Sequence, residues 1–265
     1  TPYVYARDTP DKGIAGFLDL PRYSSGYAAL HHSIGFITEA HMWKPYKDRV
    51  QGTYAFLSAA IRAMHDQREA LREAREKARR QAAEQKQFAL GWELDFSRSD
   101  TILFKGYEAK YKKSEVSGLD RLYYDRSAPY EKTIPYFRYY QPTATAERPY
   151  AYLIPQAYAE VVDRLRWNGV AVQQLTEDIE PELEYSYIED YKTVDGPYEG
   201  HYLHYAVQTR EQRLRRPFRK GDYVVFTDQP ASRYIVETLE PRGADSFFAW
   251  NFFDGILMQK EYFDG

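Results

Sequence analysis

The chain has 265 residues, and its 36 Lys and Arg against 39 Asp and Glu give a formal net charge of −3. That near-balance supplies no basic field for nucleic acid, and no apolar run reaches the roughly 18 residues that a membrane span requires. Cysteine is absent, which excludes disulfides, thiolate catalysis and thiolate metal sites. The hydrophobic share of 43% suffices for one large domain or two small ones.

The first 66 residues predict an irregular segment, a short helix, a strand and a long helix. A helix is expected from Ser24, after a stretch rich in Pro, Gly, Asp and Tyr. The apolar run 34–38 predicts a buried strand of a mostly parallel sheet, with Glu39 at its C-terminal end. A long helix is expected from near Tyr46. Apolar residues at spacings of four and three give it one face that we expect to be buried, namely Val50, Tyr54, Leu57, Ile61 and Met64.

After residue 66 the helix is expected to continue as a solvated extension, because alanines and alternating charges replace the large apolar residues. From residue 88 the chain becomes β-rich, with an irregular stretch over 118–149. A strand, a helix over 156–168 and a second strand from residue 170 then form a small unit typical of parallel pairing. Antiparallel strands over 182–226, a helix over 229–239 and an aromatic closing element over 246–263 complete the prediction.

The predicted fold class is therefore α+β, with a boundary near residue 88. Residues 1–88 would supply the strand and the long helix. Residues 89–265 would form a mixed, β-rich accessory domain that contains the small strand–helix–strand unit. That unit lacks a glycine-rich phosphate loop, so nucleotide binding is not indicated.

The residue whose type and position point most clearly to a catalytic role is Glu39. A carboxylate at the C-terminal end of a buried strand lies where open α/β sheets place their ligand clefts. It can serve as a general base if it reaches a water molecule. The alternative is a strand-end glutamate that only caps the next element or pairs with Arg49.

The stretch from Arg22-Tyr23-Ser24-Ser25-Gly26-Tyr27 to Val50 resembles the last strand and following helix of carboxypeptidase A-like zinc metallopeptidases. Later segments, such as Gly221-Asp222-Tyr223-Val224-Val225, are similar to the C-terminal extension of large bacterial members. The resemblance implies that residues 1–88 are the C-terminal piece of a peptidase catalytic domain. It also implies that Glu39 is the general base that takes a proton from a zinc-bound water.

The resemblance does not extend to the zinc ligands. The family binds zinc through His-x-x-Glu and a later His, and no His-x-x-Glu occurs in this chain. We therefore expect zinc in a longer parent protein and none here, so that the chain is inactive alone. The implied partners are a peptide substrate and the N-terminal remainder of the catalytic domain. The implied location, as for exported bacterial members, is periplasmic or secreted.

Two further residues are expected to bind substrate. Tyr23 precedes the glutamate and matches the family tyrosine that contacts substrate, and Arg22 could hold a substrate carboxylate through two parallel hydrogen bonds. Arg22 could instead pair with an acidic neighbour. The pair His201 and His204 would lie on opposite faces of a strand, which disfavours metal chelation.

Two non-catalytic alternatives remain open. The chain holds 26 tyrosines, and the β-rich part could bind peptide or glycan through exposed aromatic rings. A degenerate peptidase that serves as an interaction scaffold is the other alternative. If the rest of its sheet is missing, strand 34–38 and the helix face need a new cover, so we also expect either a homodimer or disorder near the N-terminus.

Overall fold

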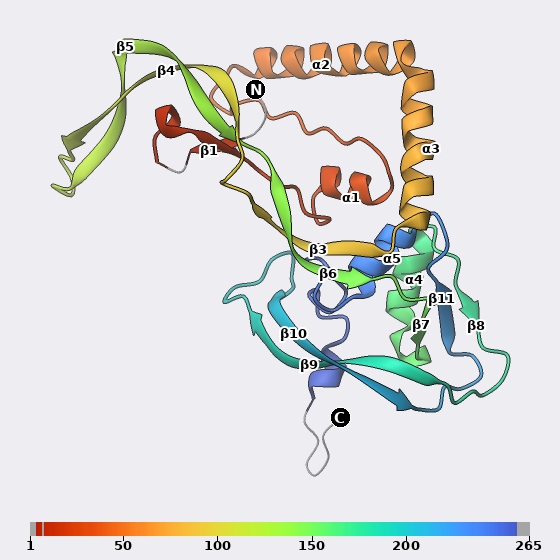
Figure 1. The fold of residues 1–265 in the computed structure, drawn as a ribbon. Helices are drawn as coiled ribbons and strands as arrows, with labels where there is room; N and C mark the ends of the chain where they lie inside the picture. The colour runs from red at the N-terminus through yellow and green to blue at the C-terminus, as the bar shows by residue number, and fades with distance from the viewer. Residues whose placement is uncertain (1–3, 7, 259–265) are drawn as a thin grey trace. The chain divides into compact units, whose positions relative to one another are not determined.

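The computed structural model describes residues 4–6 and 8–258 (Figure 1). The chain divides into two compact units, one made of the residues up to Leu18 and of Trp92–Thr143, the other of Asp19–Gly91 and the residues from Ala144 onward. It passes from one unit to the other within β3 (Gln87–Leu94) and within β6 (Tyr140–Glu147), which pair with each other. Helices and several sheets are both present, so the α+β prediction is confirmed.

The first unit is a four-stranded sheet with the order β1-β2-β5-β4. Its elements are β1 (Val4–Ala6), the 3-10 helix η1 (Pro10–Lys12), β2 (Ile14–Gly16), β4 (Asp100–Lys113) and β5 (Asp120–Phe137). Strands β4 and β5 form a long antiparallel ribbon, from the pair Asp100–Tyr136 to the pair Lys113–Asp120.

The irregular stretch predicted for 118–149 was wrong, because most of it belongs to β5 and β6. Its prolines suggested a loop. Strand β5 pairs with β4 along its length, but with β2 only at Tyr136 and Phe137. Most of β5 therefore has a partner strand on one side only. Proline is tolerated on such an edge strand.

The second unit holds all the α-helices of the described chain. They are α1 (Ser24–Leu30), α2 (Tyr46–Asp66), α3 (Arg68–Glu84), α4 (Ala159–Trp167) and α5 (Ser232–Leu239). The 3-10 helices are η2 (Gln156–Tyr158) and η3 (Asp254–Leu257). The remaining strands are β7 (Ala151–Ile154), β8 (Gln173–Gln174), β9 (Glu182–Thr193), β10 (His204–Arg215) and β11 (Tyr223–Phe226).

The core of the second unit lies between α1, α4 and α5 and the sheet β7-β11-β8. Its fully buried side chains include Val162, Leu165, Val225 and Ile235. The predicted strand and helix are confirmed in β7 and α4, but the direct parallel pairing was wrong. The apolar strand β11 lies between β7 and β8 and is antiparallel to both.

The prediction of helix over 46–84 is confirmed, but the prediction that one face of its first half is buried was wrong. Helix α2 begins at Tyr46 as expected, and α3 continues it after a break at Gln67 (Figure 1). No residue of α2 is buried, so the expectation of a buried face was wrong. The predicted strand 34–38 was also wrong, because these residues have no regular secondary structure and Ile34, Phe36 and Ile37 are exposed. A strand needs a neighbouring strand for its backbone groups, and the described chain brings none to this run.

The aromatic closing element is confirmed as far as the structure describes it. Phe247 and Phe248 are buried, and Phe247 belongs to the main core. Residues 259–263 of that prediction lie outside the described residues. Among the described helices, none is long and apolar enough to cross a membrane.

Candidate functional site

Glu39 lies in the extended connection between α1 and α2, and its side chain is exposed. It makes no hydrogen bond or ion pair with another described residue, so the alternative pairing with Arg49 is not formed. The Arg49 guanidinium instead lies 5.6 Å from the centre of the Tyr46 ring. The carboxylate is thus open to solvent and to any group that approaches this connection.

Close backbone packing holds the start of this connection against α1. At Gly26, within α1, an added Cβ would lie 2.1 Å from the Leu20 carbonyl oxygen, so only glycine fits. At Gly35 an added Cβ would lie 2.8 Å from the Ser25 Cα. Tyr23 directly precedes α1, and its backbone N–H donates to the Leu20 carbonyl at 2.9 Å. The segment that carries Tyr23 and the segment that leads to Glu39 therefore meet at the N-terminal end of α1.

Arg22 is held by a buried carboxylate from the far end of the chain. Its Nε donates to Asp245 Oδ1 at 2.8 Å, its Nη2 lies 2.7 Å from the same oxygen, and its backbone N–H donates to Oδ2 at 2.9 Å. The Asp245 side chain is 4% exposed. The Arg22 guanidinium also lies 5.7 Å from the Tyr198 ring centre and 5.6 Å from that of Trp250, whose Nε1–H donates to Asp245. Arg22 thus has the acidic neighbour that was the alternative to substrate binding.

Asp245, Tyr198 and Trp250 are the residues that sequence reasoning missed. Asp245 is 223 positions from Arg22, and no motif or spacing links the two. Tyr198 and Trp250 are partly exposed aromatic residues in a chain rich in them, so nothing in the sequence distinguishes them.

The histidines do not assemble into a metal site. His41 accepts a hydrogen bond from the backbone N–H of Trp43 at 3.2 Å. His201 pairs with Tyr198 across a two-residue turn and contacts Trp250, with the ring centres 5.3 Å apart. His204 is buried, 2.9 Å from Thr193 Oγ1 and 3.1 Å from Asp254 Oδ1. Among the described residues no three His, Asp or Glu side chains come together in a way that could hold a metal ion.

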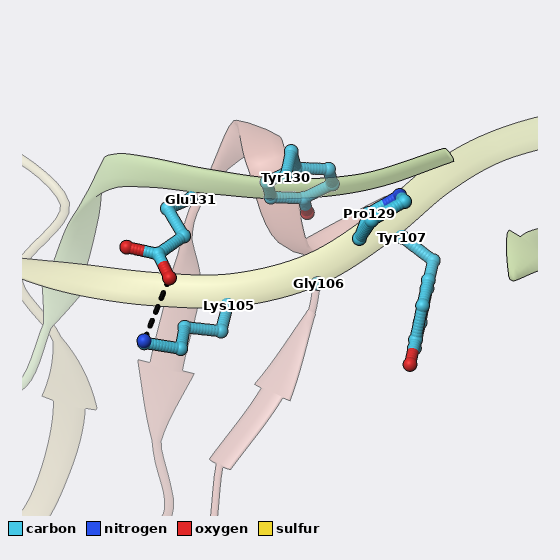
Figure 2. Close-up of a pocket in the computed structure, with 6 residues that line it drawn as sticks. All are labelled: Lys105, Gly106, Tyr107, Pro129, Tyr130 and Glu131. Atoms are coloured by element: carbon cyan, nitrogen blue, oxygen red, sulfur yellow. Dashed lines mark ion pairs between the residues drawn. The ribbon is translucent and has the colours of Figure 1, made fainter. Parts of the chain in front are cut away.

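Two open hollows are lined by none of these residues. One, of about 500 Å³, is lined by Lys86, Gln87, Glu147 and Arg148. The other, of about 340 Å³, lies on the β4–β5 ribbon and is lined by Lys105, Gly106, Tyr107, Pro129, Tyr130 and Glu131. Figure 2 shows the ion pair across this second hollow, in which Lys105 Nζ lies 2.6 Å from Glu131 Oε1. Burial raises the pKa of Tyr130, whose ring lies 4.4 Å from Lys132 Nζ.

Comparison with known proteins relates part of this α+β chain to carboxypeptidases. The chain is 32% identical over 117 residues to Carboxypeptidase 2 of Trichophyton rubrum, and 32% identical over 116 residues to Carboxypeptidase 2 of Trichophyton equinum. Each match covers 40% of this chain and 20% of the fungal protein, so the chain spans about a fifth of the length of the curated relatives it matches. No family model and no solved structure matches the chain.

Proposed function

We propose that this chain is part of a zinc carboxypeptidase of bacterial type, a hydrolase that releases residues from the carboxyl end of peptides. The observation that carries the proposal is the 32% identity to the fungal carboxypeptidases over 117 residues. The resemblance of residues 22–50 to the last strand and following helix of the carboxypeptidase A-like family also supports the proposal.

In this proposal Glu39 is the general base. A carboxylate that removes a proton from water during attack on a peptide carbonyl must reach that water, and Glu39 is exposed and engaged by no other described side chain. The strand that the resemblance implies for 34–38 would form only beside neighbouring strands of a catalytic domain.

Tyr23 and Arg22 are the proposed substrate-binding residues. Tyr23 is favoured by its place two residues before Ser25, which packs against Gly35 in the segment that leads to Glu39. For Arg22 the contacts with Asp245 have two consequences: they orient the guanidinium, and they neutralise part of its charge. A substrate carboxylate would therefore have to share Arg22 with Asp245.

The zinc that the family implies does not fit the described residues of this chain. Its ligands would be imidazole and carboxylate groups brought within about 2 Å of one ion. The described part of the chain brings no three such groups together. We therefore assign the metal to the N-terminal remainder of the catalytic domain, which is also the proposed partner of this chain, and we propose a periplasmic or secreted location.

The proposal is tested by Glu39→Gln in the full protein that contains this chain. Loss of a general base should lower kcat for release of a carboxyl-terminal residue about 10²–10⁴-fold. Glu115→Gln, at an exposed position in the β4–β5 turn, is the matched control and should leave kcat unchanged. An unchanged kcat for Glu39→Gln would contradict the assignment of Glu39 as the general base. Hydrolysis by the 265-residue chain alone, with zinc bound tightly, would refute its proposed inactivity.

A second candidate function is non-catalytic binding of peptide or glycan by the β-rich part. The observation in its favour is the exposure of three tyrosines on the β4–β5 ribbon: Tyr107, which lines the hollow of Figure 2, and Tyr111 and Tyr124 farther along the ribbon. Titration of the chain with a decapeptide and with a chitin oligomer, followed by tyrosine fluorescence, tests it. Binding that Tyr107→Ala abolishes and Tyr150→Ala preserves would favour this function, and no change with either ligand would exclude it for those ligands.

A further inference from the structure

A buried histidine lies between a hydroxyl and a carboxylate where the β9–β10 hairpin meets its connecting loop. His204 Nδ1 is 2.9 Å from Thr193 Oγ1, and His204 Nε2 is 3.1 Å from Asp254 Oδ1. A hydroxyl, a base within hydrogen-bond reach of it and a third group that orients the base are the parts of an activated nucleophile. The proposed peptidase function uses none of these three residues.

The fold holds the imidazole of His204 against the hydroxyl. Thr193 and His204 are directly opposite each other on β9 and β10, so their side chains leave the same face of the hairpin. The backbone N–H of His204 donates to the Ala249 carbonyl at 2.9 Å. The imidazole also contacts the rings of Tyr191 and Phe248, with ring centres 4.7 Å and 5.1 Å away. These contacts fix the orientation that a base needs in order to take a proton from a neighbouring hydroxyl.

The groups around His204 Nε2 decide which ring nitrogen carries the proton. Asp254, the first residue of η3, offers this nitrogen a carboxylate oxygen. Asn251 Nδ2 lies 3.2 Å from the same nitrogen, and it also donates to the Tyr202 carbonyl at 2.9 Å. A charged carboxylate forms the stronger hydrogen bond, so Nε2 holds the proton and donates it to Asp254. In this tautomer Nδ1 keeps a lone pair and accepts the hydrogen bond of the Thr193 hydroxyl.

The base of this cluster is buried, and the hydroxyl is open to solvent. The His204 side chain is 6% exposed, whereas Thr193 is an exposed residue. Burial limits the competition of water for the Nδ1 lone pair, while a reactant can still approach Thr193. Two residues near the cluster, Ala206 and Asn251, have left-handed φ angles of 52° and 68°. Backbone strain of this kind is found preferentially at functional sites.

We propose that Thr193 is a nucleophile that accepts the acyl group of activated carboxylic esters. Thr193 Oγ1 attacks the carbonyl carbon of the ester while its proton moves to His204 Nδ1. The bond between that carbon and the leaving oxygen then breaks, and the leaving alkoxide takes the proton from Nδ1. The products are an acyl ester of Thr193 and a free alcohol, so the step balances with the ester as the other reactant. Asp254 is a positioning residue, because it acts through His204.

Reaction of the 265-residue chain with p-nitrophenyl acetate tests the proposal. Ser186 is the internal comparison, since it is exposed on the same hairpin and its hydroxyl donates to the Glu211 carboxylate at 2.6 Å rather than to an imidazole. Peptide mapping by mass spectrometry should show that Thr193 is acetylated about 10²–10⁴-fold faster than Ser186. Hydroxylamine should remove this acetyl group, because it cleaves esters and leaves lysine amides intact. Equal rates at the two hydroxyls, or no acetylation of Thr193, would overturn the proposal.

Variants separate activation by the histidine from a purely structural hydrogen-bond network. Thr193→Val should abolish the fast acetylation, and Ser186→Ala should preserve it. Asp254→Asn should slow acetylation of Thr193 about 10²–10⁴-fold, because the charge that keeps the proton on Nε2 is lost and Asn251 can then donate to this nitrogen. Nitrogen NMR shifts of His204 report that change of tautomer, and circular dichroism verifies that the variants fold. An unchanged acetylation rate in Asp254→Asn, or a proton on Nδ1 in the wild-type chain, would contradict the proposed activation.

Discussion

Helices α2 and α5 carry the same kind of amphipathic pattern and differ in what covers it. Five of the eight residues of α5 are buried, and Ile235 and Val236 are 0% exposed. None of the 21 residues of α2 is buried, and Ile61 is 63% exposed. The pattern thus predicts a helix and the face that seeks an apolar neighbour. It does not say whether this chain supplies that neighbour.

Matched isoleucine truncations should give the largest contrast between the two helices. Ile235→Ala removes a fully buried side chain from the main core and should lower the free energy of unfolding by about 2–5 kcal/mol. Ile61→Ala should change it by less than about 0.5 kcal/mol, because the Ile61 side chain is 63% exposed. Urea unfolding at low protein concentration measures both. Comparable losses in the two variants would mean that α2 is covered within one chain.

Loss of the buried ion pair between Arg22 and Asp245 should lower the free energy of unfolding by a similar amount. Asp245→Asn leaves the guanidinium without its counter-charge, and losing one partner of a buried pair costs about 3–5 kcal/mol. Asp120→Asn is the control, because the pair Lys113–Asp120 is largely exposed and should contribute less than about 1 kcal/mol. Thermal unfolding compares the two variants. Equal unfolding temperatures for the two variants would show that the ion pair between Arg22 and Asp245 does not stabilise the fold.

Glycine substitutions should act with opposite sign in α1 and α2. Gly26→Ala forces the new Cβ into the Leu20 carbonyl and should destabilise the chain by about 1–3 kcal/mol. Gly52→Ala meets nothing within 4 Å in the middle of α2 and should stabilise the helix by about 0.5–1 kcal/mol. Loss of stability at Gly52 would show that something approaches this side of α2.

The smallest predicted effect is a pH dependence at the C-terminal end of α5. Burial raises the pKa of Glu240, whose Oε1 accepts a hydrogen bond from the Tyr152 hydroxyl at 2.6 Å. The folded chain therefore holds this proton more tightly than the unfolded chain. Its contribution to stability is present below the ordinary pKa of glutamate and is lost as pH rises through the raised pKa.

Glu240→Gln isolates that contribution, since the amide oxygen can still accept from Tyr152. Between pH 4 and pH 8 the wild-type chain should lose stability relative to Glu240→Gln as the pH rises. Urea unfolding of both proteins at several pH values measures this difference. A difference that stays constant with pH would show that Glu240 has the same pKa in the folded and unfolded chain.

Local patterns were enough to predict most of the helices. The start of α2 after Pro45 and the helix at α4 followed from apolar spacing and from their flanking residues. The helix α5 likewise lies within the predicted range. These elements form from interactions between residues three and four apart, which a single sequence displays directly.

The strand pairings and the environment of the candidate site could not be predicted in the same way. The run 34–38 has the composition of a buried strand, yet a strand forms only beside another strand, and the described chain offers it none. The placement of β11 between β7 and β8 depends on contacts across about 50 to 70 residues. The pairing of Arg22 with Asp245 spans nearly the whole chain. The catalytic role of Glu39 rests on its place after the predicted strand 34–38 and on the family resemblance, so it stays a prediction.

Amide hydrogen exchange in α2 and α5 most directly tests the claim that the apolar face of α5 is covered within this chain and that of α2 is not. The amides of α5 should be strongly protected, because five residues of this short helix are buried in the core of the same chain. The amides of α2 should exchange faster, since no residue of this helix is buried. Protection of α2 as strong as that of α5 would contradict the account.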